Sequence, residues 1–184
     1  KFFKISQGVD VKNVIYIMGV SGCGKTTVGE LLAKEFRIPF FDGDDFHSEE
    51  NIKKMSEGKP LNDEDRAGWL KTLNNLAIAQ LQNKGCVIAC SALKESYRSI
   101  LNAGLELNVK WVHLSGTFDE IYNRVSSRKN HFMPPELLKS QFKILETPTN
   151  CIEVSITKTP LEIIKTIKDS MKSKFGLFGL GVMG

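Results

Sequence analysis

The chain has 184 residues, of which 41% are hydrophobic and 25% are charged, and its formal net charge is +4 at pH 7. This length suits one compact domain, and no run approaches the about 18 consecutive apolar residues that a membrane-spanning helix needs. Lysine and arginine are spread along the chain, which argues against a nucleic-acid or membrane partner and allows a small anionic ligand.

Short apolar runs rich in β-branched residues alternate with segments of helical periodicity, which is typical of βα units that build a parallel sheet. Residues 1–12 precede the first run without the apolar core of a secretory signal, and we expect them to be a trimmed N-terminal extension. The four cysteines form no C-x-x-C pair, which favours a reducing compartment and predicts a cytoplasmic protein. The predicted strands cover residues 13–18, 38–41, 86–91, 109–115 and 151–156.

The first predicted strand leads directly into GVSGCGKT, which fits the phosphate-loop pattern G-x-x-x-x-G-K-[ST]. Glycines let backbone N–H groups turn toward phosphate oxygens, Lys25 can reach the β- and γ-phosphates, and the Thr26 hydroxyl can ligate Mg²⁺. The loop therefore predicts ATP or GTP with Mg²⁺, and a glycine-rich turn without a ligand is the alternative. The residues expected at the nucleotide are Gly19, Val20, Ser21, Gly22, Cys23, Gly24, Lys25, Thr26 and Thr27.

The second predicted strand ends in DGDDFH, which places Asp42 and Asp44 at the sheet edge where open α/β folds bind ligands. Phosphoryl transfer needs a positioned Mg²⁺ and a carboxylate that orients the attacking hydroxyl and takes its proton. The two aspartates can divide these roles, so we expect both to be catalytic together with Lys25. An acidic turn exposed to water is the alternative.

Later segments carry clear helix signals. Asn62 and Thr159 each begin an N-terminal capping pattern, and the helix after Asn62 has a regular apolar face from Trp69 onward. The last helix is expected to run to about Ser173. Residues 126–135 are charged, lack a helical period and end in a double proline that should start a new helix, which predicts a mobile loop.

Four longer stretches resemble, in order, the motifs of the gluconokinases, which are P-loop kinases similar in fold to shikimate and nucleoside monophosphate kinases. They are GVSGCGKTTVGELLA, FFDGDDFHSEENIKKMSEGKPLNDEDR, VIACSALKESYR and RKNHFMPPELLKSQFKILE. The resemblance implies an α/β P-loop kinase fold, with a five-stranded parallel sheet, helices on both faces and a small lid. It also implies ATP-dependent phosphorylation of D-gluconate at the 6-hydroxyl, giving 6-phosphogluconate and ADP, and a homodimer.

The resemblance assigns the catalytic roles residue by residue. Asp42 would act near Mg²⁺ through water, beside Thr26 as the other metal-binding residue. Asp44 would hold the sugar-acid hydroxyl and serve as the base. Cys23 departs from the serine that other members often carry there, and this change should not disturb binding through the backbone.

The same resemblance implies a set of substrate-binding residues. Arg66 would face the substrate, Ser91 would lie in a turn that holds polyol hydroxyls, and Lys94 could meet the gluconate carboxylate. Arg98, one helical turn further, is a second candidate for that carboxylate. Solvent-exposed surface positions are the alternative for Arg66 and Lys94.

The segment RVSSRKNHFMP resembles the lid of this kinase group. Arg124 and Arg128 are four residues apart, so on a helix they would share one face and could both reach ATP phosphates when the lid closes. Closure would exclude water and favour transfer to gluconate over hydrolysis. His131 lies in the matching segment and is assigned to the substrate without a derived role, and surface arginines are the alternative for the other two.

The last six residues, GLGVMG, fit G-x-G-x-x-G, the spacing of a dinucleotide-binding turn. They resemble the opening turn of 6-phosphogluconate dehydrogenase. We therefore expect residues 13–173 to form the kinase domain and residues 174–184 to be the truncated start of a fused dehydrogenase. A hydrophobic tail that packs on the kinase is the alternative.

Two other functions stay open at this point. One is another small-molecule kinase of the same fold, such as a shikimate or nucleotide kinase. The other is a non-catalytic nucleotide-binding switch, which the phosphate loop alone would permit.

Overall fold

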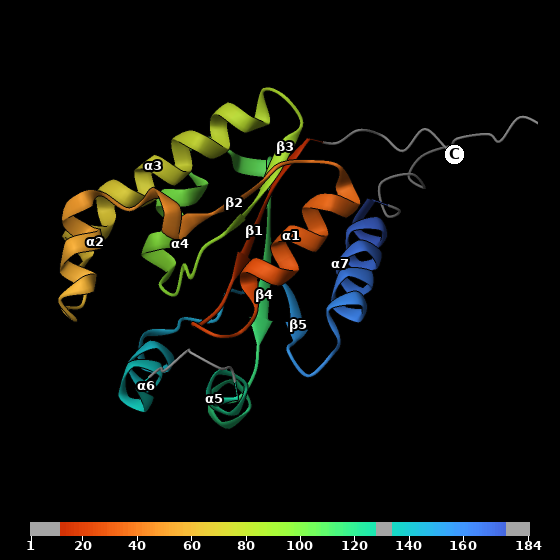
Figure 1. Ribbon diagram of the computed structural model, residues 1–184. Helices are drawn as coiled ribbons and strands as arrows, with labels where there is room; N and C mark the ends of the chain where they lie inside the picture. The colour runs from red at the N-terminus through yellow and green to blue at the C-terminus, as the bar shows by residue number, and fades with distance from the viewer. Residues whose placement is uncertain (1–11, 128–133, 176–184) are drawn as a thin grey trace, which may run out of the picture.

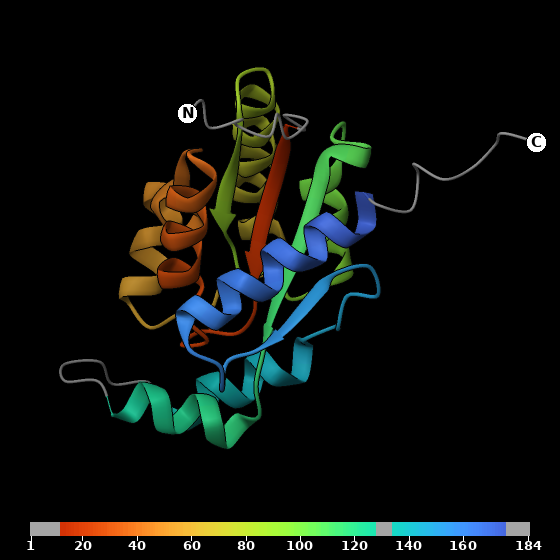
Figure 2. The same ribbon diagram turned by 90° about the vertical axis from the view of Figure 1, so that its right-hand side faces the viewer.

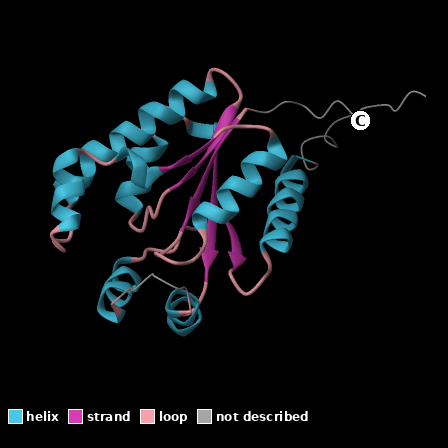
Figure 3. Ribbon diagram, viewed as in Figure 1, coloured by secondary structure: helices cyan, strands magenta, loops and turns pink. Residues whose placement is uncertain are grey.

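A parallel sheet of five strands organises the computed structural model, which describes residues 12–127 and 134–175. The strand order is β2-β3-β1-β4-β5, so β1 lies at the centre and the phosphate loop follows it directly. The predicted fold class is confirmed (Figure 3). The strands are β1 (Asn13–Met18), β2 (Phe40–Asp42), β3 (Gly85–Ala89), β4 (Val109–Ser115) and β5 (Ile152–Ser155).

Three strands, β2, β3 and β5, differ at their ends from the sequence expectation, and β5 is one residue shorter at each end than the predicted 151–156. β2 begins at Phe40 instead of residue 38, because Pro39 has no N–H for the ladder and contributes only its carbonyl, which accepts from Val87 N–H at 2.9 Å. β3 ends at Ala89, after which the chain leaves the sheet and turns at Ala92, whose φ of 45° is left-handed. That turn carries the side chains that follow β3 toward the site.

Helices cover both faces of the sheet and the end toward which its strands point (Figure 1). α1 and α7 lie on one face, side by side (Figure 2), and α3 and α4 lie on the other, while α5 and α6 lie beyond the carboxyl ends of the strands. The helices are α1 (Lys25–Phe36), α2 (Glu49–Ser56), α3 (Asp63–Leu81), α4 (Glu95–Asn102), α5 (Phe118–Ser126), α6 (Pro135–Ile144) and α7 (Pro160–Phe175), with short 3₁₀ helices η1 (Gly43–Phe46) and η2 (Glu106–Asn108).

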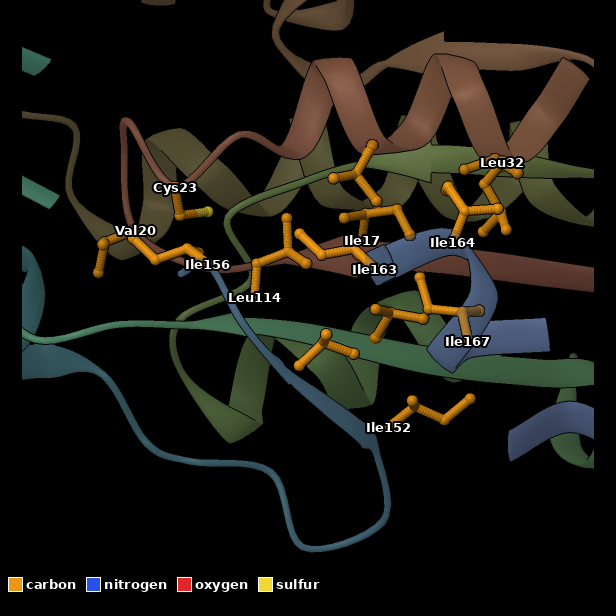
Figure 4. Close-up of a cluster of buried hydrophobic side chains, with 14 of the residues drawn as sticks. Ile17, Val20, Cys23, Leu32, Leu114, Ile152, Ile156, Ile163, Ile164 and Ile167 are labelled. Atoms are coloured by element: carbon orange, nitrogen blue, oxygen red, sulfur yellow. The ribbon is translucent and has the colours of Figure 1, made fainter. Parts of the chain in front are cut away.

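The sheet separates two apolar cores, because successive side chains of a strand point to opposite faces. Along β1, Ile15 and Ile17 pack toward α1 and α7, whereas Tyr16 and Met18 pack toward α3 and α4. Figure 4 shows the first core, in which side chains of α7 meet those of β1, β4 and β5. A strand buried on both faces explains why residues 13–18 form an almost continuous apolar run.

Both predicted capping patterns are confirmed. Asn62 accepts from the backbone N–H of Asp65 at 2.8 Å, and Asp65 accepts from the N–H of Asn62 at 2.8 Å. Thr159 and Glu162 exchange the same pair of bonds at the start of α7. Each cap stabilises its helix by about 1 kcal/mol.

Several expectations fall outside the described residues. Arg128 and His131 lie in residues 128–133, and GLGVMG lies in residues 176–184. The lid loop and the dinucleotide turn therefore stay predictions. Among the residues that the structure does describe, no helix is both long enough and apolar enough to cross a membrane.

Candidate active site

The phosphate loop connects β1 to α1 through three glycines with positive φ. These are Gly19 at 145°, Gly22 at 83° and Gly24 at 101°. Gly24 is the N-cap of α1, and no side chain caps the helix there. Because the first turn of a helix leaves its N–H groups without intrahelical acceptors, this end of α1 is open to an anion such as a phosphate.

Lys25 lies back across the loop that precedes it. Its Nζ donates to the carbonyl oxygens of Gly19 and Val20, both at 3.1 Å. Its ammonium group is thereby held over the cradle that the sequence predicted. The Cys23 side chain packs in the apolar core, and its burial there raises the pKa of its thiol.

α5 supports the loop from outside. A methyl group built on Gly22 would lie 2.1 Å from Cγ2 of Val125, so only glycine allows this close approach. Arg124 donates from Nη1 to the carbonyl oxygen of Cys23 at 3.2 Å. Arg124 therefore lies at the phosphate loop, as its predicted role requires.

Asp42 ends β2 beside the phosphate loop. Its Oδ2 accepts from the Thr26 hydroxyl at 2.8 Å, and its Oδ1 accepts from the backbone N–H of Asp44 at 3.1 Å. A hydroxyl and a carboxylate oxygen are ligands that suit Mg²⁺, which commonly binds few protein groups together with water and substrate phosphates. The described ranges contain no cluster of three or more His, Cys, Asp or Glu side chains able to hold a metal ion.

Asp44 lies in η1, two residues after Asp42. Its side chain is 86% exposed, and its Oδ1 lies 4.0 Å from Nε2 of His47. Trp69 fixes this turn, because its Nε1 donates to the carbonyl oxygen of Gly43 at 2.7 Å and its ring stacks on His47 at 4.2 Å. The Asp44 carboxylate is thus open to a ligand on a turn that is itself held in place.

His47 is buried beside that carboxylate, with 6% of its side chain exposed. Burial lowers the pKa of its imidazole, although the nearby Asp44 carboxylate acts in the opposite direction. His47 is therefore neutral at pH 7 and adds no charge to the site.

The turn after β3 brings further predicted residues to the same edge. The carbonyl oxygen of Ser91 accepts from the N–H of Gly19 at 3.4 Å, which places Ser91 against the phosphate loop. Lys94 donates to both carboxylate oxygens of Asp63, at 3.0 and 3.1 Å. Lys94 is the N-cap residue of α4. Its side chain is paired with a carboxylate instead of being fully solvated.

Arg66, Lys94 and Tyr97 gather around Asp63 at the start of α3. The Tyr97 hydroxyl donates to Asp63 Oδ1, and these bonds hold the pKa of the Asp63 carboxyl below its ordinary value, that from Tyr97 most of all. Arg66 donates to the carbonyl oxygen of Leu61, and its Cζ lies 5.7 Å from the Tyr97 ring centre. The result is a cationic group of side chains partly neutralised by one carboxylate.

Arg98 does not fit the substrate role expected for it. Its side chain is 3% exposed, and Nη1 donates to the carbonyl oxygens of Ala92 at 2.9 Å and Leu93 at 3.3 Å. The remaining nitrogens, Nε and Nη2, donate to Glu95. Arg98 therefore holds the turn that carries Ser91 and Lys94, and the bonds of its guanidinium go to Ala92, Leu93 and Glu95 of the protein itself.

Sequence reasoning missed two groups at this site. Asp63 and Tyr97 hold Lys94, and Gln141 of α6 contacts the phosphate loop at Ser21. Gln141 lies within the stretch RKNHFMPPELLKSQFKILE, but its partner is 120 positions away, so no local spacing pointed to it.

A surface hollow of about 410 Å³ also borders Asp42 and Thr26. Its other walls come from α1, β2 and η1, on the side of the sheet's edge strand. Asp44, Arg66 and Lys94 are not among its lining residues, so it lies apart from the group that the resemblance assigns to the substrate.

The strand order, the phosphate loop that opens α1 and the carboxylates after β2 define a P-loop kinase fold. The family model described as Shikimate kinase matches residues 21–167. A shikimate kinase from Aquifex aeolicus, 21% identical, superposes with a TM-score of 0.58 over 90% of this chain and 99% of its own, which supports the fold.

Proteins with a higher sequence identity to this chain identify its family more closely. A probable gluconokinase from Mus musculus is 44% identical over 89% of this chain and 100% of its own length. The thermoresistant gluconokinase of Escherichia coli (strain K12) is 41% identical over 88% of this chain and 95% of its own. The crystal structure of a gluconokinase from Sinorhizobium meliloti 1021 has a TM-score of 0.80 and 35% identity over 90% of this chain and 98% of its own. The chain belongs to the gluconokinase family.

Proposed function

We propose that the chain transfers the γ-phosphoryl group of ATP to the 6-hydroxyl of D-gluconate, giving 6-phosphogluconate and ADP. Family membership supports gluconate as the acceptor. The geometric observation that carries the proposal is the 2.8 Å hydrogen bond between Thr26 and Asp42, because it joins the phosphate cradle to the carboxylates after β2. These two parts are what phosphoryl transfer requires.

In this proposal, the protein's residues mainly position the two substrates and stabilise the charge that develops during transfer. The loop amides and Lys25 bind the phosphates, with Arg124 adding a cation at the loop. Thr26 and Asp42 would hold Mg²⁺, which neutralises the charge that develops on the phosphate oxygens. The gluconate O6 attacks the γ-phosphorus, its proton passes to the exposed Asp44 carboxylate, and the bond to the bridging oxygen of ADP breaks.

The acceptor is proposed to lie between η1 and the turn after β3. Lys94 pairs with Asp63 there and Arg66 lies over the adjacent Tyr97 ring. The charged side chains of Arg66, Lys94 and Asp63 together carry one net positive charge, which suits a monoanionic sugar acid. Ser91 borders the loop and would meet polyol hydroxyls. The roles of Arg128 and His131 stay predictions, as do the homodimer and the fused dehydrogenase.

A cytoplasmic location is proposed from the state of the cysteines. Three of the four cysteines, Cys23, Cys86 and Cys90, are buried thiols, which suits a reducing compartment where ATP is abundant.

The experiment that tests the proposal compares Asp44→Asn with Asp45→Asn. Both side chains are exposed in η1, so Asp45→Asn is a control for charge and fold. A base at Asp44 predicts a loss of about 10²–10⁴-fold in turnover with ATP binding kept, and little change for the control. Equal turnover in both variants would remove Asp44 as the base, whereas ATP binding without turnover in the wild-type chain would favour a nucleotide-binding switch.

A further inference from the structure

Gln141 of α6 makes two hydrogen bonds with Ser21 in the middle of the phosphate loop. The backbone N–H of Ser21 donates to Oε1 of Gln141 at 2.7 Å, and Nε2 of Gln141 donates to the Ser21 hydroxyl at 3.0 Å. The two residues are 120 positions apart. One side-chain amide is therefore matched to both polar groups of a single loop residue.

The chemistry of the pair fixes its orientation. A backbone N–H can only donate, so the carbonyl end of the amide must face it, and the NH₂ end then faces the hydroxyl. Leucine, of similar size, could make neither bond. The contact thus depends on the amide group and not on packing alone.

The phosphate loop needs such external support. Gly19, Gly22 and Gly24 all have positive φ, and glycine gives the backbone much conformational freedom that must be lost on ordering. Arg124 of α5 holds the carbonyl oxygen of Cys23, and Gln141 holds the N–H of Ser21. The two helices that flank residues 128–133 are therefore each hydrogen-bonded to the loop.

We propose that Gln141 is a positioning residue that holds the phosphate loop in the conformation that binds ATP. It fixes the loop at Ser21 and leaves the N–H groups in the first turn of α1 for the phosphates. A loop ordered before binding loses less freedom when the nucleotide arrives, so affinity rises. This inference rests on the proposed use of ATP but not on gluconate as the acceptor.

The same contact between Gln141 and Ser21 could also have the opposite effect on ATP binding. If Gln141 occupied an N–H group that the phosphate needs, it would compete with the nucleotide. Removing it would then strengthen ATP binding, whereas our proposal predicts that binding weakens. The sign of the change separates the two roles.

The test measures the binding of a non-hydrolysable ATP analogue with Mg²⁺ by calorimetry, without gluconate. Gln141→Leu is expected to raise the dissociation constant about tenfold, the scale of one to two net hydrogen bonds. Ser140→Ala is the matched control, because the exposed Ser140 hydroxyl, within the part of the chain that the structure describes, bonds only to the carbonyl oxygen of Leu137 in its own helix. In turnover assays, the KM for ATP should rise more than the KM for the acceptor.

A double-mutant cycle distinguishes the loop contact from a general loss of structure. Ser21→Ala should weaken binding less in the Gln141→Leu background than in the wild-type chain, because the shared bond is already lost. Unchanged or tighter analogue binding, or fully additive effects, would overturn the proposal. Should Gln141→Leu lower the melting temperature sharply, Gln141→Asn, whose amide is one carbon shorter, gives the same readout.

Discussion

Replacing Arg98 with methionine should destabilise the fold, because Arg98 holds the turn that leads from β3 to α4. Its buried guanidinium donates to the carbonyl oxygens of Ala92 and Leu93, and Ala92 has a left-handed φ of 45°. Leu93 keeps a second donor, the N–H of Glu146, but no other bond to the Ala92 carbonyl is found among the described residues. One orphaned buried acceptor and the lost packing predict a cost of about 2–3 kcal/mol.

Thermal unfolding measures this cost directly. For a domain of this size the melting temperature should fall by about 5–10 °C. Lys71→Met, at an exposed position of α3, is the control for the loss of a cation and should change it little. A wild-type melting temperature combined with a large rise in the KM for gluconate would refute the reasoning and restore Arg98 as a substrate ligand.

Three further predictions concern other residues of the site and of the core. Gly22→Ala should weaken the binding of Mg²⁺-ATP by about tenfold or more in calorimetry, because the new methyl group meets Val125 at 2.1 Å and φ is positive; unchanged affinity would contradict the loop geometry. Lys94→Met should raise the KM for gluconate about tenfold and leave the KM for ATP unchanged; equal rises in both would argue against a carboxylate contact. Burial lowers the pKa of His113, so the unfolded chain binds a proton more readily and stability falls as the pH drops below about 6.5. The melting temperature of His113→Leu should therefore fall less than that of the wild type between about pH 7 and about pH 5. An equal fall in both would count against this linkage.

Sequence patterns predicted those parts of the site whose residues lie close together along the chain. The phosphate loop needs glycines, a lysine and a threonine at fixed spacing, so its position between β1 and α1 could be read from GVSGCGKT. Asp42 could be placed at the sheet edge because parallel strands end together there. The caps at Asn62 and Thr159 were equally visible, since each bonds within three residues.

Contacts between distant segments could not be predicted from spacing. Arg98 lies four residues after Lys94 and was expected to share its role, but its guanidinium is buried and bonds to the carbonyl oxygens of Ala92 and Leu93. The pairing of Gln141 with Ser21 joins α6 to the phosphate loop and depends on how α6 packs beyond the sheet. Such contacts are set by tertiary packing, which overrides what a local pattern suggests.

The most direct test of the whole account is an ADP-release assay on the wild-type chain with Mg²⁺-ATP held constant. Gluconate, shikimate and a nucleoside monophosphate are supplied separately, each at the same concentration. The account predicts turnover with gluconate alone, with 6-phosphogluconate as the product. Turnover with shikimate or the nucleotide in the absence of any with gluconate would contradict it.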